Sequence, residues 1–181
     1  MKYCSRCGSE LSYRVPEGDD RSRFICDSCG IVHYENPKMV VGCIPEIDDQ
    51  VLFCRRSILP QYGKWTIPAG YLEKGETVEA GAKRETFEEA GARIKSIKPY
   101  GLYNLTFISQ VYLIFRGRLV DGNFGAGDES LEVRLFREEE VPWADLAFPV
   151  IRETLKFYFR DRLNGVFPFH IAEIKSVSQT G

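Results

Sequence analysis

The residues of this chain best suited to chemistry are three glutamates at helical spacing, Glu85, Glu88 and Glu89. The stretch that holds them, residues 77–90, has no proline and is rich in Ala, Glu and Lys, so it should be helical. On a helix, positions i, i+3 and i+4 project from one arc, which gathers the three carboxylates. Like charges this close repel one another unless a cation neutralises them.

Hard divalent cations with oxygen ligands, Mg²⁺ or Mn²⁺, suit such a set of carboxylates. A Mg²⁺ site of this kind usually completes its coordination with waters and substrate phosphates. The chemistry indicated is therefore metal-assisted attack of water on a phosphoanhydride. The alternative for an isolated acidic run is a solvated helix whose charges keep the protein in solution.

The spacing of further residues separates these two interpretations. The stretch 70–92 reads GYLEKGETVEAGAKRETFEEAGA and fits G-x5-E-x7-R-E-U-x-E-E-x-G-U, where U is a bulky apolar residue. The matching positions are Gly70, Glu76, Arg84, Glu85, Glu88, Glu89 and Gly91, whereas Thr86 and Ala92 stand where U is usual. The stretch resembles the Nudix box, and the chain is identified as a member of the Nudix hydrolase family.

The resemblance implies a role for each box residue. The carboxylates of Glu85, Glu88 and Glu89 would hold Mg²⁺ or Mn²⁺ on a pyrophosphate, and the Gly70 carbonyl would join them. Arg84 would pair with an acidic neighbour, for which Glu76 is the candidate, and fix the loop against the helix.

A second source of carboxylates is the glycine-rich acidic loop 121–130. In Nudix enzymes a carboxylate from this region commonly serves as the general base or as a further metal ligand. Glu129 and Glu132 both qualify, because they flank the start of an expected strand at 133–136, and the sequence does not choose between them. A mobile loop could bring such a base to the attacking water.

The residues that would bind substrate are less well defined. Arg55 and Arg56 end an expected strand where the family often has a basic residue that meets substrate, although a simple exposed charge explains them equally well. Four aromatic residues are candidates to stack on adenine or flavin, and core packing is the commoner role for each of them: Tyr62, Trp65, Tyr103 and Phe107.

Four cysteines near the start of the chain form two C-x-x-C pairs, Cys4/Cys7 and Cys26/Cys29, separated by 18 residues. This spacing is typical of a four-thiolate zinc site. Two disulfides are the alternative, but we expect a leaderless chain in a reducing compartment, where disulfides are rare. A redox-active C-x-x-C would be expected once, beside a βαβ unit. We therefore predict a structural zinc ribbon without an open coordination position.

The apolar pattern predicts the elements that position these residues. Strands are expected at 39–47 and 50–55, joined by a hairpin, and again at 92–100, 106–119 and 133–136. A final helix over 149–163 would bury Ile151, Leu155, Tyr158 or Phe159, and Leu163. Together with the resemblance, this implies an α/β fold, a Nudix α/β/α sandwich with a mixed sheet, preceded by a small zinc-ribbon β module.

Composition and length complete the picture. We expect a zinc ribbon over 1–35, a Nudix hydrolase domain over 36–173 and, because apolar content falls, a flexible tail over 174–181. A net charge of −2 argues against a general polyanion binder, and acidic residues offset the basic ones of the ribbon, so no nucleic-acid partner is expected. No apolar run reaches 18 residues, so we expect a soluble, cytoplasmic protein without a membrane partner. A homodimer is a family-level expectation.

The substrate is the harder question, since the box specifies the reaction and not the group attached to the diphosphate. The NADH pyrophosphatase and RNA-decapping branch carries S-Q-P-W-P-F-P-x-S after the box, whereas residues 109–113 read SQVYL. The chain is more similar to plant chloroplast enzymes that hydrolyse FAD and ADP-ribose. The shared segments are 36–43 (NPKMVVGC), 68–73 (PAGYLE), 129–132 (ESLE), 134–136 (RLF) and 146–148 (LAF).

This likeness favours a small nucleotide substrate, FAD or ADP-ribose, cleaved to AMP plus FMN or ribose 5-phosphate. The alternatives are an NADH pyrophosphatase or RNA-decapping enzyme and a non-catalytic module that senses a nucleotide. The enzyme is favoured over the sensing module because every box carboxylate is present.

Overall fold

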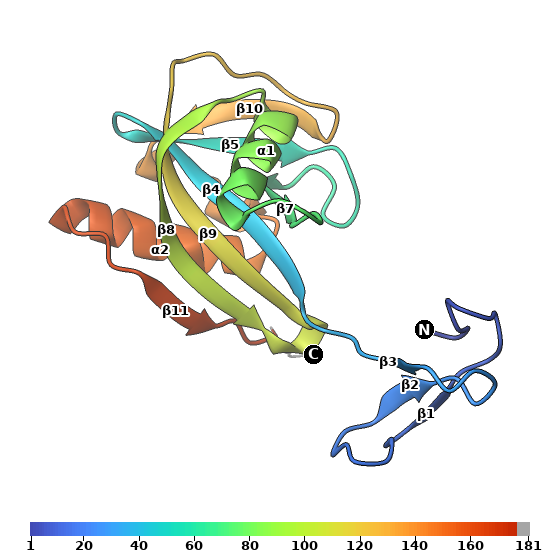
Figure 1. Ribbon diagram of the computed structural model, residues 1–181. Helices are drawn as coiled ribbons and strands as arrows, with labels where there is room; N and C mark the ends of the chain where they lie inside the picture. Colours follow the sequence, from blue (N-terminus) through green and yellow to red (C-terminus); the bar gives the residue numbers. More distant parts are fainter. Residues whose placement is uncertain (177–181) are drawn as a thin grey trace. The chain divides into compact units, whose positions relative to one another are not determined.

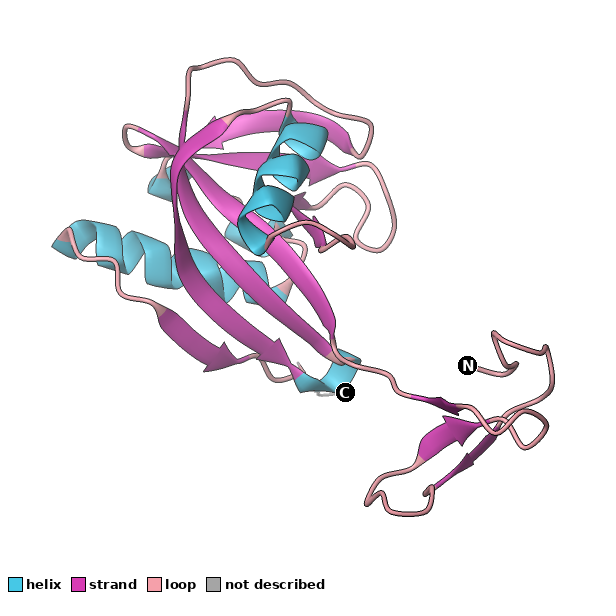
Figure 2. Ribbon diagram, viewed as in Figure 1, coloured by secondary structure: helices cyan, strands magenta, loops and turns pink. Residues whose placement is uncertain are grey.

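The computed structural model describes residues 1–176 and divides the chain into two compact units, with the boundary between Pro37 and Lys38. The first unit holds a small antiparallel sheet in the order β1-β2-β3 (Figures 1 and 2). Its strands are β1 (Ser12–Arg14), β2 (Arg23–Ile25) and β3 (Val32–His33).

The second unit is built on a mixed sheet whose main path runs β10-β5-β4-β9-β8-β11. Its strands are β4 (Lys38–Ile47), β5 (Gln50–Arg56), β6 (Trp65–Thr66), β7 (Ala69–Tyr71), β8 (Ile94–Leu105), β9 (Gln110–Leu119), β10 (Ser130–Phe136) and β11 (His170–Glu173). The β4–β9 and β8–β11 pairs are parallel. The short strands β6 and β7 pair antiparallel with β5 and β4. The predicted α/β fold with a mixed sheet is confirmed.

Two α-helices, α1 (Val78–Ala90) and α2 (Pro149–Asn164), cover opposite faces of this sheet (Figure 1). Three short 3₁₀ turns connect other elements: Thr106–Ile108, Glu138–Glu140 and Trp143–Asp145. Within residues 1–176, none of the helices has the length and apolar character needed to cross a membrane.

The helix α1 packs closely on its face through small side chains. Ala82, Thr86 and Ala90 are fully buried, and the two alanines lie with Val41 and Cys43 of β4 in one hydrophobic cluster. The Thr86 hydroxyl donates to the Ala82 carbonyl at 2.7 Å, so this buried polar group is satisfied. On the opposite face of the sheet the core is made of larger residues, among them Ile44 and Phe53 of the sheet and Ile151, Leu155 and Tyr158 of α2.

Local signals set the ends of α1. The Thr77 hydroxyl accepts from the Ala80 N–H at 3.1 Å, which is the usual N-cap bond. Gly91 ends the helix in the left-handed region, with φ of 58°, and its N–H donates to the Phe87 carbonyl. Because both ends are fixed, residues 78–90 form one continuous helix that includes all three glutamates.

The structure corrects several sequence-based expectations. Residues 106–108 form a 3₁₀ turn and not a strand, because Ser109 adopts a left-handed φ of 51° that reverses the chain into β9. Leu163, expected in the core, is 81% exposed near the end of α2. The strand β11 was not predicted, and Ile174, placed in the expected tail, is buried and donates its N–H to Asn104. Residues 177–181 of that tail lie outside the described part.

A buried polar cluster ties α2 to β11. Asp161 is 4% exposed, accepts from the Tyr100 hydroxyl at 2.7 Å and lies 2.5 Å from the His170 ring nitrogen. Burial alone would raise the pKa of Asp161, but hydrogen bonds from His170, Tyr100 and Arg160 outweigh it, and the net pKa is lowered.

We expect Asp161→Ala to lower the free energy of unfolding by about 3 kcal/mol, because it leaves a buried hydroxyl and imidazole without their shared acceptor. Both tryptophans, Trp65 and Trp143, lie in the second unit, so tryptophan fluorescence during denaturant unfolding reports this unit alone. Glu153→Ala, which removes an exposed partner of Lys156, should change the value by about 0.5 kcal/mol or less. Equal effects of both variants would show that the cluster does not hold β11.

Candidate active site

Gly70 and Glu85 lie against each other at the centre of the site. Gly70 belongs to β7, pairs with Val41 of β4 and faces α1. A Cβ built on Gly70 would overlap the Glu85 carboxylate, so only glycine allows this approach. The first position of the box is therefore a close contact between backbone and carboxylate.

One guanidinium group organises the carboxylates around it. Arg84 donates to both oxygens of Glu76, at 3.1 and 2.8 Å, and to the Tyr71 carbonyl at 3.0 Å. Its Nη1 also donates to Glu85 at 2.7 Å and to Glu88 at 2.8 Å. The bond from Arg84, helped by the Glu73 N–H, lowers the pKa of Glu76 to about 2. Arg84 thus joins the loop before α1 to the helix itself.

Glu89 is the most deeply buried carboxylate of the box, at 6% exposed. It accepts one hydrogen bond, from the Ala69 N–H at 3.3 Å. Burial, with the nearby charge of Glu85, raises the pKa of Glu89 to about 8, against the opposing effects of the Ala69 N–H and Arg56. Burial also raises the pKa of Glu85. Ionising both groups is therefore unfavourable without a further cation.

The loop 121–130 is hydrogen-bonded to the end of α1. The Gly125 N–H donates to Ala90 at 2.8 Å and the Gly127 N–H to Glu89 at 3.1 Å, both at main-chain carbonyls. A Cβ at Gly127 would overlap the Glu88 carbonyl, which explains a glycine there. The Glu129 carbonyl accepts from the Ser57 N–H at 2.9 Å. The loop that holds Glu129 is therefore hydrogen-bonded at several points, both to the end of α1 and to Ser57.

This anchoring separates the two candidate bases. Glu129 is exposed, and its charge adds, after burial, to the raised pKa of both Glu85 and Glu89. Glu132 instead sits opposite Arg55 in the β10–β5 register, with 3.8 Å between carboxylate and guanidinium. The two residues therefore face different partners.

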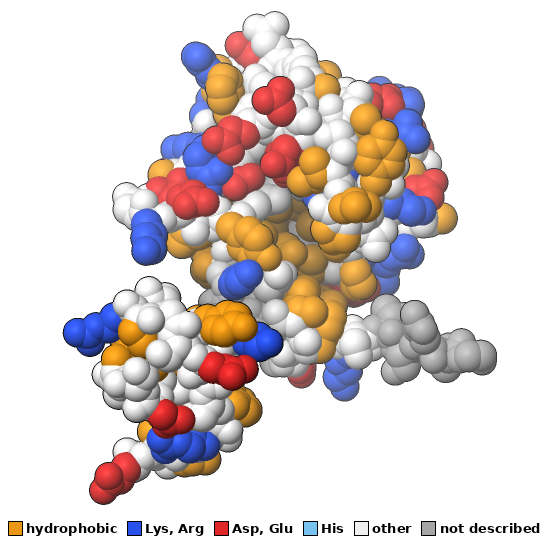
Figure 3. Space-filling view, turned by 90° about the vertical axis from the view of Figure 1, so that its right-hand side faces the viewer, with side chains coloured by type: hydrophobic (Ala, Val, Ile, Leu, Met, Phe, Trp, Pro, Cys, Tyr) orange, Lys and Arg blue, Asp and Glu red, His pale blue; other side chains and the backbone are white. Residues whose placement is uncertain are grey.

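The carboxylates of the site exceed the cations available to them. On this side of the molecule, acidic side chains gather around basic ones (Figure 3). Arg84 forms ion pairs with Glu76, Glu85 and Glu88 at the same time. Within residues 1–176, Glu89 has no ion-pair partner. The donors are all hard oxygens, so the set fits Mg²⁺ or Mn²⁺. The four cysteine sulfurs lie within 4.8 Å of one another. In the described residues they are the one group of three or more metal-binding side chains whose ligand atoms lie this close together. The glutamate oxygens are more widely spaced.

The candidate substrate-binding residues differ in their surroundings. Arg56 is 9% exposed, donates to the Pro60 carbonyl at 2.9 Å and lies over Phe148, so it points inward. Arg55 is exposed and donates to the Gly63 carbonyl at 3.0 Å. Arg56 is thus the arginine whose charge reaches Glu89, and Arg55 faces Glu132.

The aromatic candidates divide in the same way. Tyr103 is fully buried in the core, which overturns it as a stacking residue, and Trp65 is half-buried edge-on against Phe136. Tyr62 and Phe107 are 60% and 48% exposed. The aromatic rings of these two residues are therefore accessible for stacking on a ligand.

Sequence reasoning missed Tyr71, which directly follows Gly70. Its ring is 47% exposed, Lys38 lies over it at 5.3 Å, and its hydroxyl accepts from Gln110 at 3.0 Å. These three residues belong to different strands, so no local spacing could have shown the group.

The cysteines form a separate centre in the first unit. The Cys4 and Cys29 sulfurs are 3.8 Å apart and those of Cys7 and Cys26 are 3.4 Å apart, and all four thiols are free. All four sulfurs lie within 4.8 Å of one another. The cluster has the composition of a closed structural zinc site.

Comparison with known proteins identifies the family. The family profile described as Nudix N-terminal matches residues 2–35, and the NUDIX domain profile matches residues 36–158. The chain therefore belongs to the Nudix hydrolase family, a family of pyrophosphohydrolases, and carries the N-terminal zinc-ribbon module. A solved NUDIX hydrolase from Nitrosomonas europaea is 52% identical, with a TM-score of 0.93 over 97% of this chain and 100% of that one.

Curated relatives are more distant. The NAD-capped RNA hydrolase NudC of Photobacterium profundum is 26% identical over 86% of this chain and 58% of its own length. The human mitochondrial NAD(P)H pyrophosphatase NUDT13 is 27% identical over 98% of this chain and 48% of its own length. The chain thus spans about half to three fifths of these two relatives.

The raised pKa of Glu89 gives a pH dependence that can be tested. Because the folded-state pKa of about 8 lies above the ordinary 4.5, the folded protein binds more protons between these values. Without added Mg²⁺ or Mn²⁺, the free energy of unfolding should fall as pH rises from about 4.5 to about 8. Glu89→Gln should reduce this slope in denaturant titrations followed by tryptophan fluorescence. The exposed Glu79→Gln on the same helix should keep the slope, and an unchanged slope in Glu89→Gln would contradict the assignment.

Proposed function

We propose that the chain hydrolyses the pyrophosphate bond of a nucleoside diphosphate derivative, using Mg²⁺ or Mn²⁺ held by Glu85, Glu88 and Glu89 with the Gly70 carbonyl. The observation that carries this proposal is the surplus of carboxylates on α1, two of them with pKa values raised by burial. When bound, the metal supplies electrostatic stabilisation of the charge that develops on the phosphate oxygens. Zn²⁺ on the four cysteines has a structural role in this proposal.

The protein groups then have distinct tasks. Arg84 orients Glu85 and Glu88 and, through Glu76, joins the loop to the helix, so it acts as a positioning residue. Glu129 is our candidate for the general base, because it is exposed to water in the loop that is hydrogen-bonded to the end of α1, and its charge acts on Glu85 and Glu89. It would accept the proton of the attacking water.

For the substrate, the relatives favour a nicotinamide dinucleotide. Both curated relatives described above are named for NAD-capped RNA or NAD(P)H. We therefore place NAD(H) first and take AMP plus the nicotinamide mononucleotide as products.

FAD or ADP-ribose is the second candidate, and one observation favours it. Residues 110–113 lack the prolines of the NADH branch and pair regularly with both β4 and β8. A proline there would remove an N–H from one of these ladders. NAD(H), FAD and ADP-ribose all contain adenosine diphosphate, so the proposed chemistry is common to them.

The test is a product assay with Mg²⁺ or Mn²⁺ on the zinc-loaded protein against NAD⁺, NADH, FAD, ADP-ribose and NAD-capped RNA. We expect AMP from the dinucleotides, with NADH highest. Glu88→Gln, at an exposed position, should lower kcat by about 100-fold or more while the fold survives, since several kcal/mol of charge stabilisation depend on the metal. Glu79→Gln, on the same helix and paired with Lys83, should retain activity.

The outcomes discriminate between the alternatives. Preferred cleavage of FAD or ADP-ribose would replace the first candidate by the second. Nucleotide binding without turnover of any substrate would refute the enzyme and favour the sensing module.

The two candidate bases are separated by a matched pair of variants. We expect Glu129→Gln to lower kcat by about 10²-fold or more, in the range for loss of a general base, and to remove the acidic limb of the pH–rate profile. Glu132→Gln, which loses only an exposed contact to Arg55, should change kcat by less than about threefold. The reverse order would assign the base to Glu132.

A further inference from the structure

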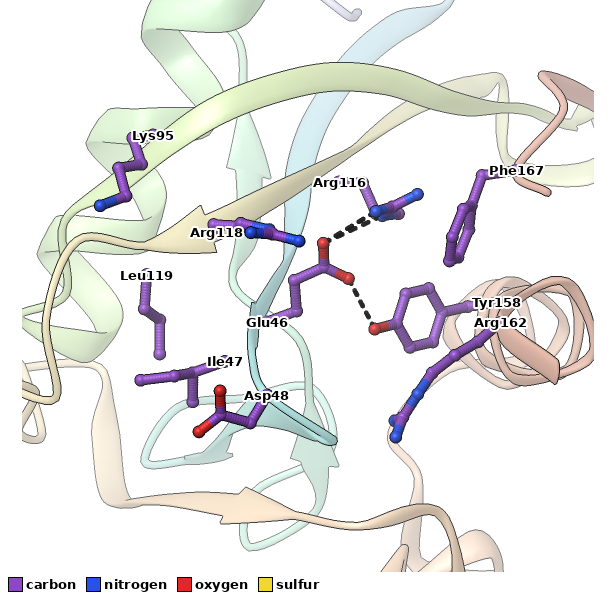
Figure 4. A pocket seen from close by; sticks show the side chains of 10 residues that line it. All are labelled: Glu46, Ile47, Asp48, Lys95, Arg116, Arg118, Leu119, Tyr158, Arg162 and Phe167. Atoms are coloured by element: carbon purple, nitrogen blue, oxygen red, sulfur yellow. Dashed lines mark hydrogen bonds and ion pairs between the residues drawn. The ribbon is translucent and has the colours of Figure 1, made fainter. Parts of the chain in front are cut away.

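A cavity opens on the face of the sheet opposite the box carboxylates. It has a volume of about 410 Å³ and is lined by residues of β4, β8, β9 and α2 and by Phe167 (Figure 4). Arg116 and Arg118 lie two and four residues after Ile114 on β9, and side chains two residues apart on a strand point to the same face of the sheet. Ile114 packs in the core on the α2 side, so both arginines face that side. Glu46, which pairs with Arg118, lies four residues beyond Gly42 on β4. The volume is in the range of small-molecule sites.

The lining is mainly basic. Four cations, Lys95, Arg116, Arg118 and Arg162, face two carboxylates, Glu46 and Asp48. The cavity therefore carries an excess of two positive charges, whereas the whole chain has a net charge of −2. This concentration of positive charge is opposite in sign to the site on α1.

Several of these groups are held in place before any ligand arrives. Glu46 accepts from Arg116 at 2.9 Å and from the Tyr158 hydroxyl at 2.7 Å. The Arg116 guanidinium lies 3.3 Å from the centre of the Phe167 ring, and Arg162 donates to the Asp49 carbonyl at 2.6 Å. Glu46 is thus engaged already, and its charge is matched by Arg116. Such fixed donors lose little freedom when they bind an anion.

The remaining two cations are placed against each other. Lys95 of β8 sits directly opposite Arg118 of β9, and like charges in that position destabilise a strand pair. An irregularity in β8 between Lys95 and Lys98, where Ser96 has a φ of 52°, creates this register. Within residues 1–176, neither Lys95 nor Arg118 forms an ion pair or a side-chain hydrogen bond. Their positive charges are available to a ligand.

We propose that this cavity binds a small dianion of the phosphate type, either free phosphate or a phosphomonoester, through Lys95 and Arg118 with Arg116 beside them. Lysine and arginine N–H groups are the usual donors to phosphate oxygens, and a dianion would relieve the repulsion between the opposed cations. The cavity has room for a nucleoside monophosphate as well as for phosphate alone. The proposal does not depend on the reaction at α1, which uses the other face.

The test is an NMR titration of the zinc-loaded full chain, without Mg²⁺ or Mn²⁺, with inorganic phosphate, AMP and uncharged adenosine. We expect saturable shifts of the backbone amides of Lys95, Arg116 and Arg118 with phosphate and AMP but not with adenosine. Equal affinities would show that phosphate alone is recognised, and tighter AMP binding would show a nucleotide site. Arg118→Gln should weaken binding about tenfold, the loss of one charge-assisted hydrogen bond.

Lys98→Gln is the matched control, because Lys98 lies opposite Arg116 on the same two strands but does not line the cavity. It should change the affinity by less than about twofold. Lys95→Gln provides a second variant at an exposed position should Arg118→Gln perturb the fold. The proposal is overturned if those amides do not shift at about 10 mM phosphate or AMP, if adenosine binds as tightly as AMP, or if Lys98→Gln weakens binding as much as Arg118→Gln.

Discussion

A single arginine connects the parts of the candidate catalytic centre. Arg84 bonds at once to the loop glutamate Glu76 and to two helix glutamates, Glu85 and Glu88, so the loop cannot shift without disturbing the helix. The closeness of Gly70 to Glu85 and the small buried residues of α1 follow from the same requirement, because the helix must lie within reach of β7. One positive charge cannot neutralise this many carboxylates, and burial raises the pKa of two of them. The packing therefore creates the demand for a divalent cation.

The mixed sheet keeps two unlike environments apart. One face carries α1 and its carboxylates, and the other carries α2, most of the large apolar core and the cavity lined by arginines and lysine. Because side chains alternate along a strand, neighbouring residues of β4 serve different faces: Val41 and Cys43 contact α1, whereas Ile44 and Glu46 face α2. One strand thereby supports both an acidic site and a basic cavity.

Family membership and substrate choice rest on different residues. The box residues lie within the part of the chain that the NUDIX domain profile matches, and the curated relatives described above are named for NAD-capped RNA and for NAD(P)H. Apart from 68–73, which overlaps the start of the box, the sequence likeness to FAD and ADP-ribose enzymes lies in segments outside it, where a few pocket residues can alter preference. The relatives shift the weight toward the nicotinamide dinucleotides, which the sequence alone had placed second. The box does not determine the substrate, because the group beyond the diphosphate contacts residues that the box does not contain.

Features that depend on local spacing could be predicted from the sequence. The Ala, Glu and Lys content of residues 77–90 and the absence of proline there predicted α1, and the C-x-x-C pairs predicted the four-sulfur cluster. Contacts between residues far apart in the sequence could be identified only from the folded chain. It buried Tyr103, exposed Leu163, turned Arg56 inward, anchored the loop 121–130 to α1 and separated Glu129 from Glu132. These outcomes depend on strand order and on which face each residue occupies, and a difference of one residue in strand register exchanges the two faces.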